Sequence, residues 1–454
     1  MTHQFPSSDP ERRPARLRAL KFALLALLMA GGALLLGLTG TTLRTGWIAP
    51  RDWLLPGTVA IVGLLLARHR MGGRRRHHAL WTWAVAALPV GMFCLLAGMG
   101  WPLTAVVLLA AGLGLAALAS GWALRLGPPA RWLALGAVVG AAALAPTLVT
   151  AWPSGSTSDA GGPAIGVMTG VPLQGVPLGA TQGVTAPEAI GMRSPLWHGL
   201  DTRFRPRALD ALDPASIEGL TALLLVQPRR LAPEELVALD GWVRRGGRLV
   251  ALADPLLHWP DPRPLGHPAR APLTSLLDPL LTHWGLRLEP AEADGAGDTL
   301  ERRRLTDGGM VQLSGASRFT ALGHGSCTLV DDGLIARCRI GQGTALLVAD
   351  ADWVNDSLWT MDPTNPADRG AWTSDAVDLL DGWLRDAPPR LMTSGTWLAD
   401  RDALLRALRG ALTLLLALCV LEWLVGAYPT QSPANSDTEK DQSRNKSTTK
   451  SDSG

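Results

Sequence analysis

The stretch Leu220–Pro255 decides the fold class, and its sequence is LTALLLVQPRRLAPEELVALDGWVRRGGRLVALADP. Its first part, Leu220–Val226, is a continuous apolar run, which is typical of a strand buried on both faces. Pro233–Arg245 follows with apolar residues at helical spacing and ends before two glycines. Arg248–Ala253 is a second apolar run. A strand, a helix and a strand in this order predict a parallel sheet covered by helices.

The sequence on either side repeats this alternation. We expect further strands at Ala164–Met168, Leu286–Leu288 and Ala345–Ala349. We expect further helices at Leu276–Trp284 and Asp375–Leu384. The class is therefore α/β, with a doubly wound, mostly parallel sheet.

This α/β region lies in a polar block, 153–400, that is enclosed by long apolar stretches. They are Leu20–Leu43, Trp53–Ala67, Ala79–Met99, Leu103–Leu124 and Trp132–Trp152 before the block, and Ala403–Val425 after it. Most reach the roughly 20 residues that a helix needs to cross a bilayer. The second is the shortest and contains Pro56. We expect a five-span membrane domain at 20–152 and a sixth transmembrane helix at 401–428.

Basic residues in the short segments set the expected orientation, because Arg and Lys are held on the cytoplasmic side during insertion. The N-terminal segment, 1–19, and the loop Arg68–His78 are both rich in Arg. The N-terminus is then cytoplasmic, 153–400 is extracytoplasmic, and the tail 429–454 is cytoplasmic and, from its polar composition, disordered. Arg401, Arg406 and Arg409 at the outer end of the sixth span oppose the rule, and snorkelling into headgroups accounts for them. This is the topology of a multi-pass protein of a bacterial-type inner membrane.

Composition limits the function classes. The net charge is only +3, so nothing points to nucleic acid as a partner. The spans contain almost no ionisable residue besides Glu422, and ion transport needs such groups in the membrane. Of the 18 tryptophans, several, including Trp47 and Trp53, fall near span ends, where we expect them to be interfacial anchors. The sequence contains no G-x-x-x-x-G-K-[ST] phosphate loop.

Two of the four cysteines are candidates for a disulfide. Cys327 and Cys338 flank the hairpin-like sequence CTLVDDGLIARC. A two-residue turn at Asp332-Gly333 places the cysteines opposite each other, whereas a three-residue turn moves them out of register. An extracytoplasmic location permits the bond, and both arrangements remain open.

The expected strands end in polar residues, and ligands of such sheets bind beyond these ends. The candidate ligand-binding residues are Thr169, Gly170, Gln227, Asp254, Asp350, Asp352 and Asn355. The alternative is that Asp254 and Asp350 only cap turns after their strands.

A metal site is a further alternative for the sequence after Asp254. Its ligands would be Asp254, His258, Asp261 and His267. The prolines between these residues favour a loop, so we assign no metal and no cofactor.

Two pieces of this region resemble a known family. Leu223–Pro255 together with GQGTALLVADADWVNDSLW (Gly341–Trp359) resembles the extracytoplasmic domain of gliding-motility-type ABC transporter auxiliary proteins. It also resembles related domains of unknown function with a class I glutamine-amidotransferase-like fold. The resemblance implies an accessory role beside an ABC transporter, with permease and ATPase subunits as partners.

Amidotransferase chemistry needs a nucleophile on a sharp turn between a strand and a helix. Here the strand leads into Asp254-Pro255, and the sequence contains no G-x-S-x-G or G-x-C-x-G motif. We therefore expect a non-enzymatic cell-envelope membrane protein, an auxiliary subunit whose amidotransferase-like domain binds a ligand or partner. The alternative is a membrane-anchored hydrolase that uses the carboxylates at the strand ends.

Overall fold

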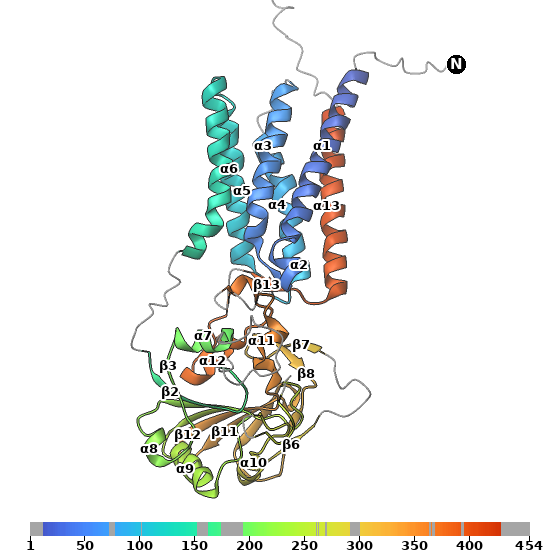
Figure 1. Cartoon of the computed structure of the whole chain (residues 1–454). Coiled ribbons are helices and arrows are strands. Elements are labelled where there is room, and N and C mark those ends of the chain that lie inside the picture. Colours follow the sequence, from blue (N-terminus) through green and yellow to red (C-terminus); the bar gives the residue numbers. More distant parts are fainter. Residues whose placement is uncertain are drawn as a thin grey trace, which may run out of the picture.

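The computed structural model describes residues 12–71, 78–100, 102–151, 162–173, 194–259, 261, 263–267, 270–290, 300–362, 365, 368–391 and 395–427. The tail expected to be disordered, 429–454, lies outside the described residues. Within them, a bundle of long helices stands above a domain built on a twisted sheet (Figure 1).

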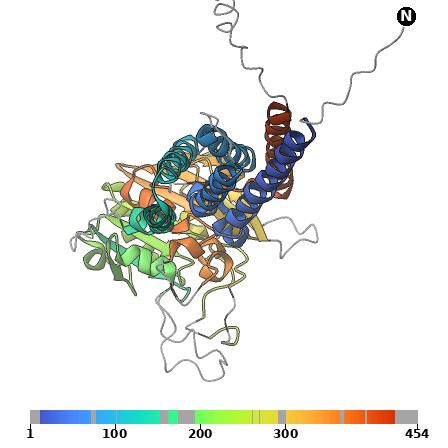
Figure 2. The same ribbon diagram turned by 90° about the horizontal axis from the view of Figure 1, so that it is seen from above.

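Among the described residues, the bundle contains six helices long and apolar enough to cross a membrane. They are α1 (Arg12–Leu38), α3 (Leu54–Arg70), α4 (His78–Ala97), α5 (Leu103–Ala123), α6 (Pro128–Ala151) and α13 (Arg401–Ala427). Viewed from above, α1 and α13 lie side by side at one edge of the bundle (Figure 2). The first helix ends at Leu38, earlier than the apolar stretch, and the short helix α2 (Thr41–Thr45) follows it.

The shortest apolar stretch forms a longer helical segment than its sequence indicates. The 3₁₀ turn η1 (Pro50–Trp53) leads into α3, and the two together give a 21-residue candidate span. Pro56 lies in the first turn of α3, where no hydrogen bond is lost to its missing N–H. At the far end of this helix Arg68 forms an ion pair with Glu422 of α13.

The central sheet of the α/β domain has seven strands in the order β10-β11-β12-β5-β4-β2-β3. Their bounds are β2 Ala164–Thr169, β3 Arg205–Ala208, β4 Ala222–Val226, β5 Arg248–Leu252, β10 Cys327–Val330, β11 Ile335–Ile340 and β12 Gly343–Val348. Neighbours from β12 to β3 pair in parallel, whereas β10 and β11 add an antiparallel edge. The sheet is therefore mixed, with a parallel centre.

Helices cover both faces of this centre. On one face lie α7 (Pro195–Asp201) and α12 (Ala376–Arg385), and on the other lie α9 (Pro233–Arg244) and α10 (Asp278–His283). Residues of one strand alternate between the two faces, so Leu224 packs in the core with α12 while Leu225 packs in the core with α9. Both side chains are fully buried.

Several shorter elements complete the domain. Two separate ribbons pair β6 (Leu286–Glu289) with β9 (Arg318–Ala321) and β7 (Leu300–Arg304) with β8 (Met310–Ser314). The strand expected at Leu286–Leu288 therefore lies outside the central sheet. The remaining short helices are α8 (Pro214–Ile217), α11 (Asp356–Trp359), η3 (Asp331–Gly333), η4 (Asp352–Val354) and η5 (Arg369–Ala371).

The edge hairpin β10–β11 carries the two cysteines of the domain. Asp332 (φ 57°, ψ 32°) and Gly333 (φ 85°) have the positive φ angles of a type I′ turn. With this turn Cys327 lies directly opposite Cys338, and a disulfide joins them.

A small ribbon attaches the domain to the bundle. β1 (Trp47–Ile48), from the connection between α1 and α3, pairs with β13 (Thr396–Trp397), which precedes α13. The rings of Trp47 and Trp397 meet edge to face at 4.9 Å. The indole of Trp397 donates a 2.7 Å hydrogen bond to Oδ2 of Asp375, at the start of α12. The two parts of the chain are thus joined by backbone pairing as well as by side chains.

Candidate functional site

Three carboxylates meet at the carboxyl ends of the parallel strands. Asp254 lies two residues beyond β5, and Asp350 and Asp352 follow β12. Because β5 and β12 are parallel and in register up to Leu252 and Val348, both chains leave the sheet at the same edge. One carboxylate oxygen from each aspartate lies within 4.8 Å of the others, and all three residues are buried. We call these three residues the strand-end carboxylate cluster.

Main-chain amides hold Asp254 in place. Its Oδ1 accepts a 2.8 Å hydrogen bond from the amide of Leu256, which is the turn-capping bond that Asp commonly makes. Its Oδ2 accepts a 3.1 Å bond from the amide of Ala351, in the loop after β12. Asp254 therefore caps its own turn and also connects the two strand ends.

The other two carboxylates are only half satisfied. Oδ1 of Asp350 accepts a 3.1 Å bond from the amide of Trp353, and Oδ2 of Asp352 accepts a 2.7 Å bond from the amide of His258. The remaining oxygens, Oδ2 of Asp350 and Oδ1 of Asp352, are buried with no hydrogen-bond partner among the described residues. A buried oxygen without a donor is costly when it carries charge.

Burial changes the acidity of the cluster. It raises the pKa of Asp352 to about 7, and the charge of Asp254 adds to this effect. The pKa of Asp350 is raised well above its ordinary value by burial, and then by the charges of Asp254 and Asp352. Burial also raises the pKa of Asp254. Two chemical states relieve the repulsion: protonation near neutral pH, or a hard divalent cation, for which carboxylate oxygens are preferred ligands.

Gln227 supports the cluster from the neighbouring strand end. Its Oε1 accepts a 2.9 Å bond from the amide of Asp254, and its Nε2 donates to the carbonyls of Asp254 and Pro272 at 2.9 and 3.0 Å. It is fully buried and has a φ of 41°, in the left-handed region that is uncommon for residues other than glycine. Its amide group fixes the loop after β5 and is fully used in doing so.

The remaining candidate residues bond locally. The hydroxyl of Thr169 donates to the carbonyl of Val171 at 2.8 Å, and the amide of Gly170 donates to the carbonyl of Val226 at 3.0 Å. The side chain of Asn355 caps α11 by accepting bonds from Ser357. The sheet thus gathers all the predicted residues at one edge, but the contacts unite only the three aspartates and Gln227.

The metal ligands considered from the sequence divide differently in space. Nδ1 of His258 lies 3.5 Å from Oδ2 of Asp352 and 3.2 Å from the carbonyl of Ser314. Asp261 is occupied by an ion pair with Arg263. Among the described residues, the set close enough to share a metal is Asp254, Asp350 and Asp352, without Asp261 or His267. The spacing in the sequence suggested ligands close to Asp254 in the chain. In the structure, the parallel sheet instead places Asp254 next to Asp350 and Asp352, which follow β12.

The sequence of this domain matches a transport family. Residues 163–300 match the family described as an ABC-type uncharacterized transport system. This range begins just before β2 and includes Thr169, Gln227 and Asp254, and it covers less than half of the chain. The ABC transporter part of the resemblance is thereby confirmed, and the glutamine-amidotransferase-like fold stays a prediction. No curated protein matches the chain in sequence.

Solved structures resemble the chain only loosely. An exo-β-1,4-mannosidase from Opitutaceae bacterium strain TAV5 is 15% identical, with 53% of this chain and 38% of that chain covered and a TM-score of 0.28. A β-galactosidase from Bacillus circulans sp. alkalophilus is 11% identical, with 36% and 25% covered and a TM-score of 0.23. A cytoplasmic protein from Salmonella typhimurium is 11% identical, with 43% and 87% covered and a TM-score of 0.26. The chain spans well under half of the length of these two glycosidases.

Proposed function

We propose that this protein is an auxiliary subunit of an ABC-type transport system, anchored in the membrane by its helical bundle. The observation that carries the proposal is the family match over residues 163–300, the part of the chain that forms β2 to β6 of the α/β domain. The six apolar helices that accompany this domain support a membrane location. We call the chain an auxiliary subunit because its sequence contains no phosphate loop for ATP, so the ATPase of the system is a separate chain.

The proposed topology places the α/β domain outside the cytoplasm. The Arg-rich segments before α1 and between α3 and α4 support an inside start. The disulfide between Cys327 and Cys338 supports an oxidising compartment for the domain. The bundle and the domain share the β1–β13 ribbon, so a partner bound to one part is physically connected to the other.

The proposed partners are a permease subunit and an ATPase subunit. The direct test is purification of the full chain, carrying an affinity tag, from its own host in a mild detergent. We expect both subunits to be recovered in stoichiometric amounts. A multi-pass membrane protein of the same host with the same tag is the control, and recovery no greater than with that control contradicts the proposal.

The strand-end carboxylate cluster is the proposed ligand- or partner-binding site of the domain. The three buried aspartates and the two oxygens without partners support this role, since protein interiors rarely leave such groups unsatisfied. Asp254→Ala and Asp352→Ala are expected to abolish the transport phenotype while the protein still folds and still recovers its subunits. An unchanged phenotype in both variants contradicts a functional role for the cluster.

A membrane-anchored hydrolase is the second candidate function. The observation that favours it is the raised pKa of Asp352, about 7, next to a second carboxylate, because a general acid or base works best near the ambient pH. Hydrolytic activity of the purified protein that is lost in Asp352→Asn supports this candidate. Activity that survives in Asp352→Asn excludes the cluster as its source.

A further inference from the structure

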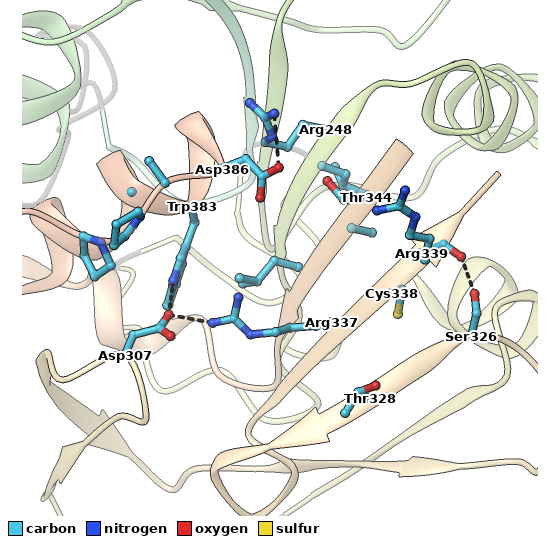
Figure 3. Close-up of a pocket in the computed structure, with 17 residues that line it drawn as sticks. Arg248, Asp307, Ser326, Thr328, Arg337, Cys338, Arg339, Thr344, Trp383 and Asp386 are labelled. Carbon is cyan, nitrogen blue, oxygen red and sulfur yellow. Dashed lines mark hydrogen bonds and ion pairs between the residues drawn. The ribbon is translucent and has the colours of Figure 1, made fainter. Parts of the chain in front are cut away.

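A second polar region lies at the opposite, amino-terminal end of the parallel strands. It is a groove of about 480 Å³, a volume typical of small-molecule sites. Its floor is formed by residues of the strands β10, β11 and β12 and of the start of β5 (Figure 3). Its wall is the last turn of α12 with the chain after it, including Trp383 and Pro389. We call it the arginine groove.

The strand register aligns cations and hydroxyls across this floor. Arg339 of β11 pairs with Thr344 of β12, which in turn pairs with Arg248 of β5. Residues in register on neighbouring strands point to the same face, so these three side chains form one row. A second row is formed by Thr328 and Arg337, which pair between β10 and β11. The floor therefore offers three guanidinium groups and two threonine hydroxyls.

Part of this donor capacity is already used. Arg337 is paired with Asp307 at 2.6 Å, and the same carboxylate accepts a 2.7 Å hydrogen bond from the indole of Trp383. Arg248 lies 3.6 Å from Asp386, whose side chain is 66% exposed at the rim of the groove. Nη1 of Arg248 also donates a 3.1 Å hydrogen bond to the carbonyl of Leu384. Arg337 is thus already engaged, whereas Nη2 of Arg248 makes only the long contact with Asp386.

Other donor groups that line the groove have no partner among the described residues. The guanidinium of Arg339 makes no hydrogen bond or ion pair with the residues that the structure describes, and it is exposed. Nη2 of Arg248 becomes available once Asp386, at the exposed rim, moves away. The hydroxyls of Thr328 and Thr344 also lack partners within the described ranges. Arg339, Thr344 and Arg248 lie in register on three adjacent strands, and Thr328 lies in the next row.

We propose that the arginine groove binds a soluble sugar that carries a carboxylate or phosphate group. Arg339 holds the anionic group in a two-point geometry that matches carboxylate and phosphate oxygens, and Nη2 of Arg248, on the other side of Thr344, adds one further contact. The threonine hydroxyls, which both donate and accept, bond to the sugar hydroxyls. The anion displaces Asp386 from its long contact with Arg248. The groove is separate from the strand-end carboxylate cluster, so the ligand proposed here does not depend on that site.

The disulfide holds the strands that form the floor of the groove in a fixed register. Cys338 lies between Arg337 and Arg339 and is bonded to Cys327 on β10, which fixes the pairing of the two edge strands. The hydroxyl of Ser326 also donates to the carbonyl of Arg339. A floor held in one register costs less ordering when a ligand binds.

Calorimetric titration of the full chain tests the proposal, in a detergent that contains neither sugar nor phosphate. The probes are galacturonate, glucose 6-phosphate, inorganic phosphate and uncharged glucose. We expect saturable binding of the two charged sugars, weaker binding of inorganic phosphate and none of glucose. In Arg339→Gln the affinity for the charged sugars falls at least about tenfold, as expected for the loss of a charge-assisted pair. Arg287→Gln, an exposed arginine on β6 outside the groove, leaves the affinity unchanged.

Three results overturn the proposal. They are no saturable binding of any charged probe, equal affinity in the wild type and Arg339→Gln, and inorganic phosphate binding as tightly as the sugars. Titration in nanodiscs containing phosphatidylglycerol separates a soluble anion from a lipid headgroup. Loss of the sugar response there assigns the groove to the headgroup. Thr344→Val provides a second variant, because it keeps every charge and is expected to weaken only the sugar probes.

Discussion

The main-chain amide of His258 donates a 2.7 Å hydrogen bond to Oδ2 of Asp352, which joins the loop after β5 to the loop after β12. This bond favours the charged carboxylate and lowers its pKa, while burial raises it, and burial has the larger effect. The result is a carboxyl group that titrates near neutral pH inside the domain. The stability of the domain should report this titration directly.

The first prediction concerns pH. Because the folded pKa of Asp352, about 7, lies above its ordinary value of 3.8, the folded chain binds this proton more tightly than the unfolded chain. Its stabilising contribution is present below about pH 4 and is lost as the pH rises through about 7. The free energy of unfolding of the full chain should therefore fall by a few kcal/mol between pH 5 and pH 8, since one pKa unit equals about 1.4 kcal/mol. The thermal midpoint should fall with it.

Variants identify the group responsible. Asp352→Asn should reduce the dependence of the thermal midpoint on pH, because its side chain stays neutral; Asp254 and Asp350, whose pKa values are also raised, account for the slope that remains. Asp210→Asn replaces an exposed aspartate and should keep the wild-type slope. A slope that is the same in Asp352→Asn and in the wild type shows that another group titrates.

The second prediction concerns the disulfide. The denatured, unreduced protein should contain two free thiols, Cys94 and Cys419, and four after reduction. Cys327→Ala/Cys338→Ala should lower the free energy of unfolding by about 3 kcal/mol, the chain-entropy value for a loop of this length. Four thiols before reduction rule out the bond.

The third prediction compares two glycines with the same backbone angle. A Cβ on Gly285 (φ 81°) would lie 1.7 Å from the carbonyl oxygen of His324, whereas a Cβ on Gly266 (φ 82°) meets no described atom within 4 Å. Gly266→Ala should cost only the left-handed strain, about 1 kcal/mol. Gly285→Ala should cost roughly 3 kcal/mol or more, because backbone must move. Equal thermal midpoints for the two variants contradict this packing around Gly285.

The fourth prediction tests the attachment of the domain to the bundle. Trp397→Phe keeps the ring against Trp47 but removes the hydrogen bond to the buried carboxylate of Asp375. We expect a loss of about 1–3 kcal/mol in unfolding free energy. Trp132→Phe, at a tryptophan that is 54% exposed on α6, should be neutral in the same detergent. A neutral Trp397→Phe excludes this hydrogen bond as a contributor to stability.

The fifth prediction concerns topology. Val237 on α9 is 74% exposed, and Met71 at the end of α3 is 36% exposed, so a cysteine at either position is accessible to a reagent on its own side. A membrane-impermeant maleimide should label Val237→Cys in cells whose outer envelope lets the reagent through while the inner membrane stays closed. It should label Met71→Cys only after the inner membrane is opened. The reverse pattern places the α/β domain in the cytoplasm.

The strand and helix pattern of the parallel centre was predictable because burial there is uniform. The run Leu220–Val226 is apolar throughout, and β4 occupies its end, Ala222–Val226, with every residue buried. The elements with polar sequences were not found: β3 has the sequence RPRA and β7 has the sequence LERRR, and neither has a buried face of its own. Edge strands and small ribbons depend on pairing with distant residues, which periodicity does not record.

The sequence predicted where the site lies, but not which of its carboxylate oxygens are hydrogen-bonded. The rule that parallel strands end at one edge brought Asp254 to Asp350 and Asp352. Which oxygens lack partners depends on amides such as those of Leu256 and Ala351, whose positions follow only from three-dimensional structure.

Long-range contacts also changed the role of the tryptophans near span ends. Trp53 is fully buried and donates to the carbonyl of Leu34, and Trp47 packs against Trp397. Both were expected to be interfacial anchors. Trp53 instead packs inside the helix bundle, against Phe93, and Trp47 lies at the connection between bundle and domain.

The β1–β13 ribbon also orders the biogenesis of the protein. Trp47 and Ile48 emerge among the first residues synthesised, and their partners Thr396 and Trp397 emerge only after the whole α/β domain. The early strand therefore stays unpaired until the α/β domain and the strand β13 have been synthesised. Docking of the two halves is the final assembly step, and a chain truncated before Thr396 would present an open strand edge to quality-control proteases.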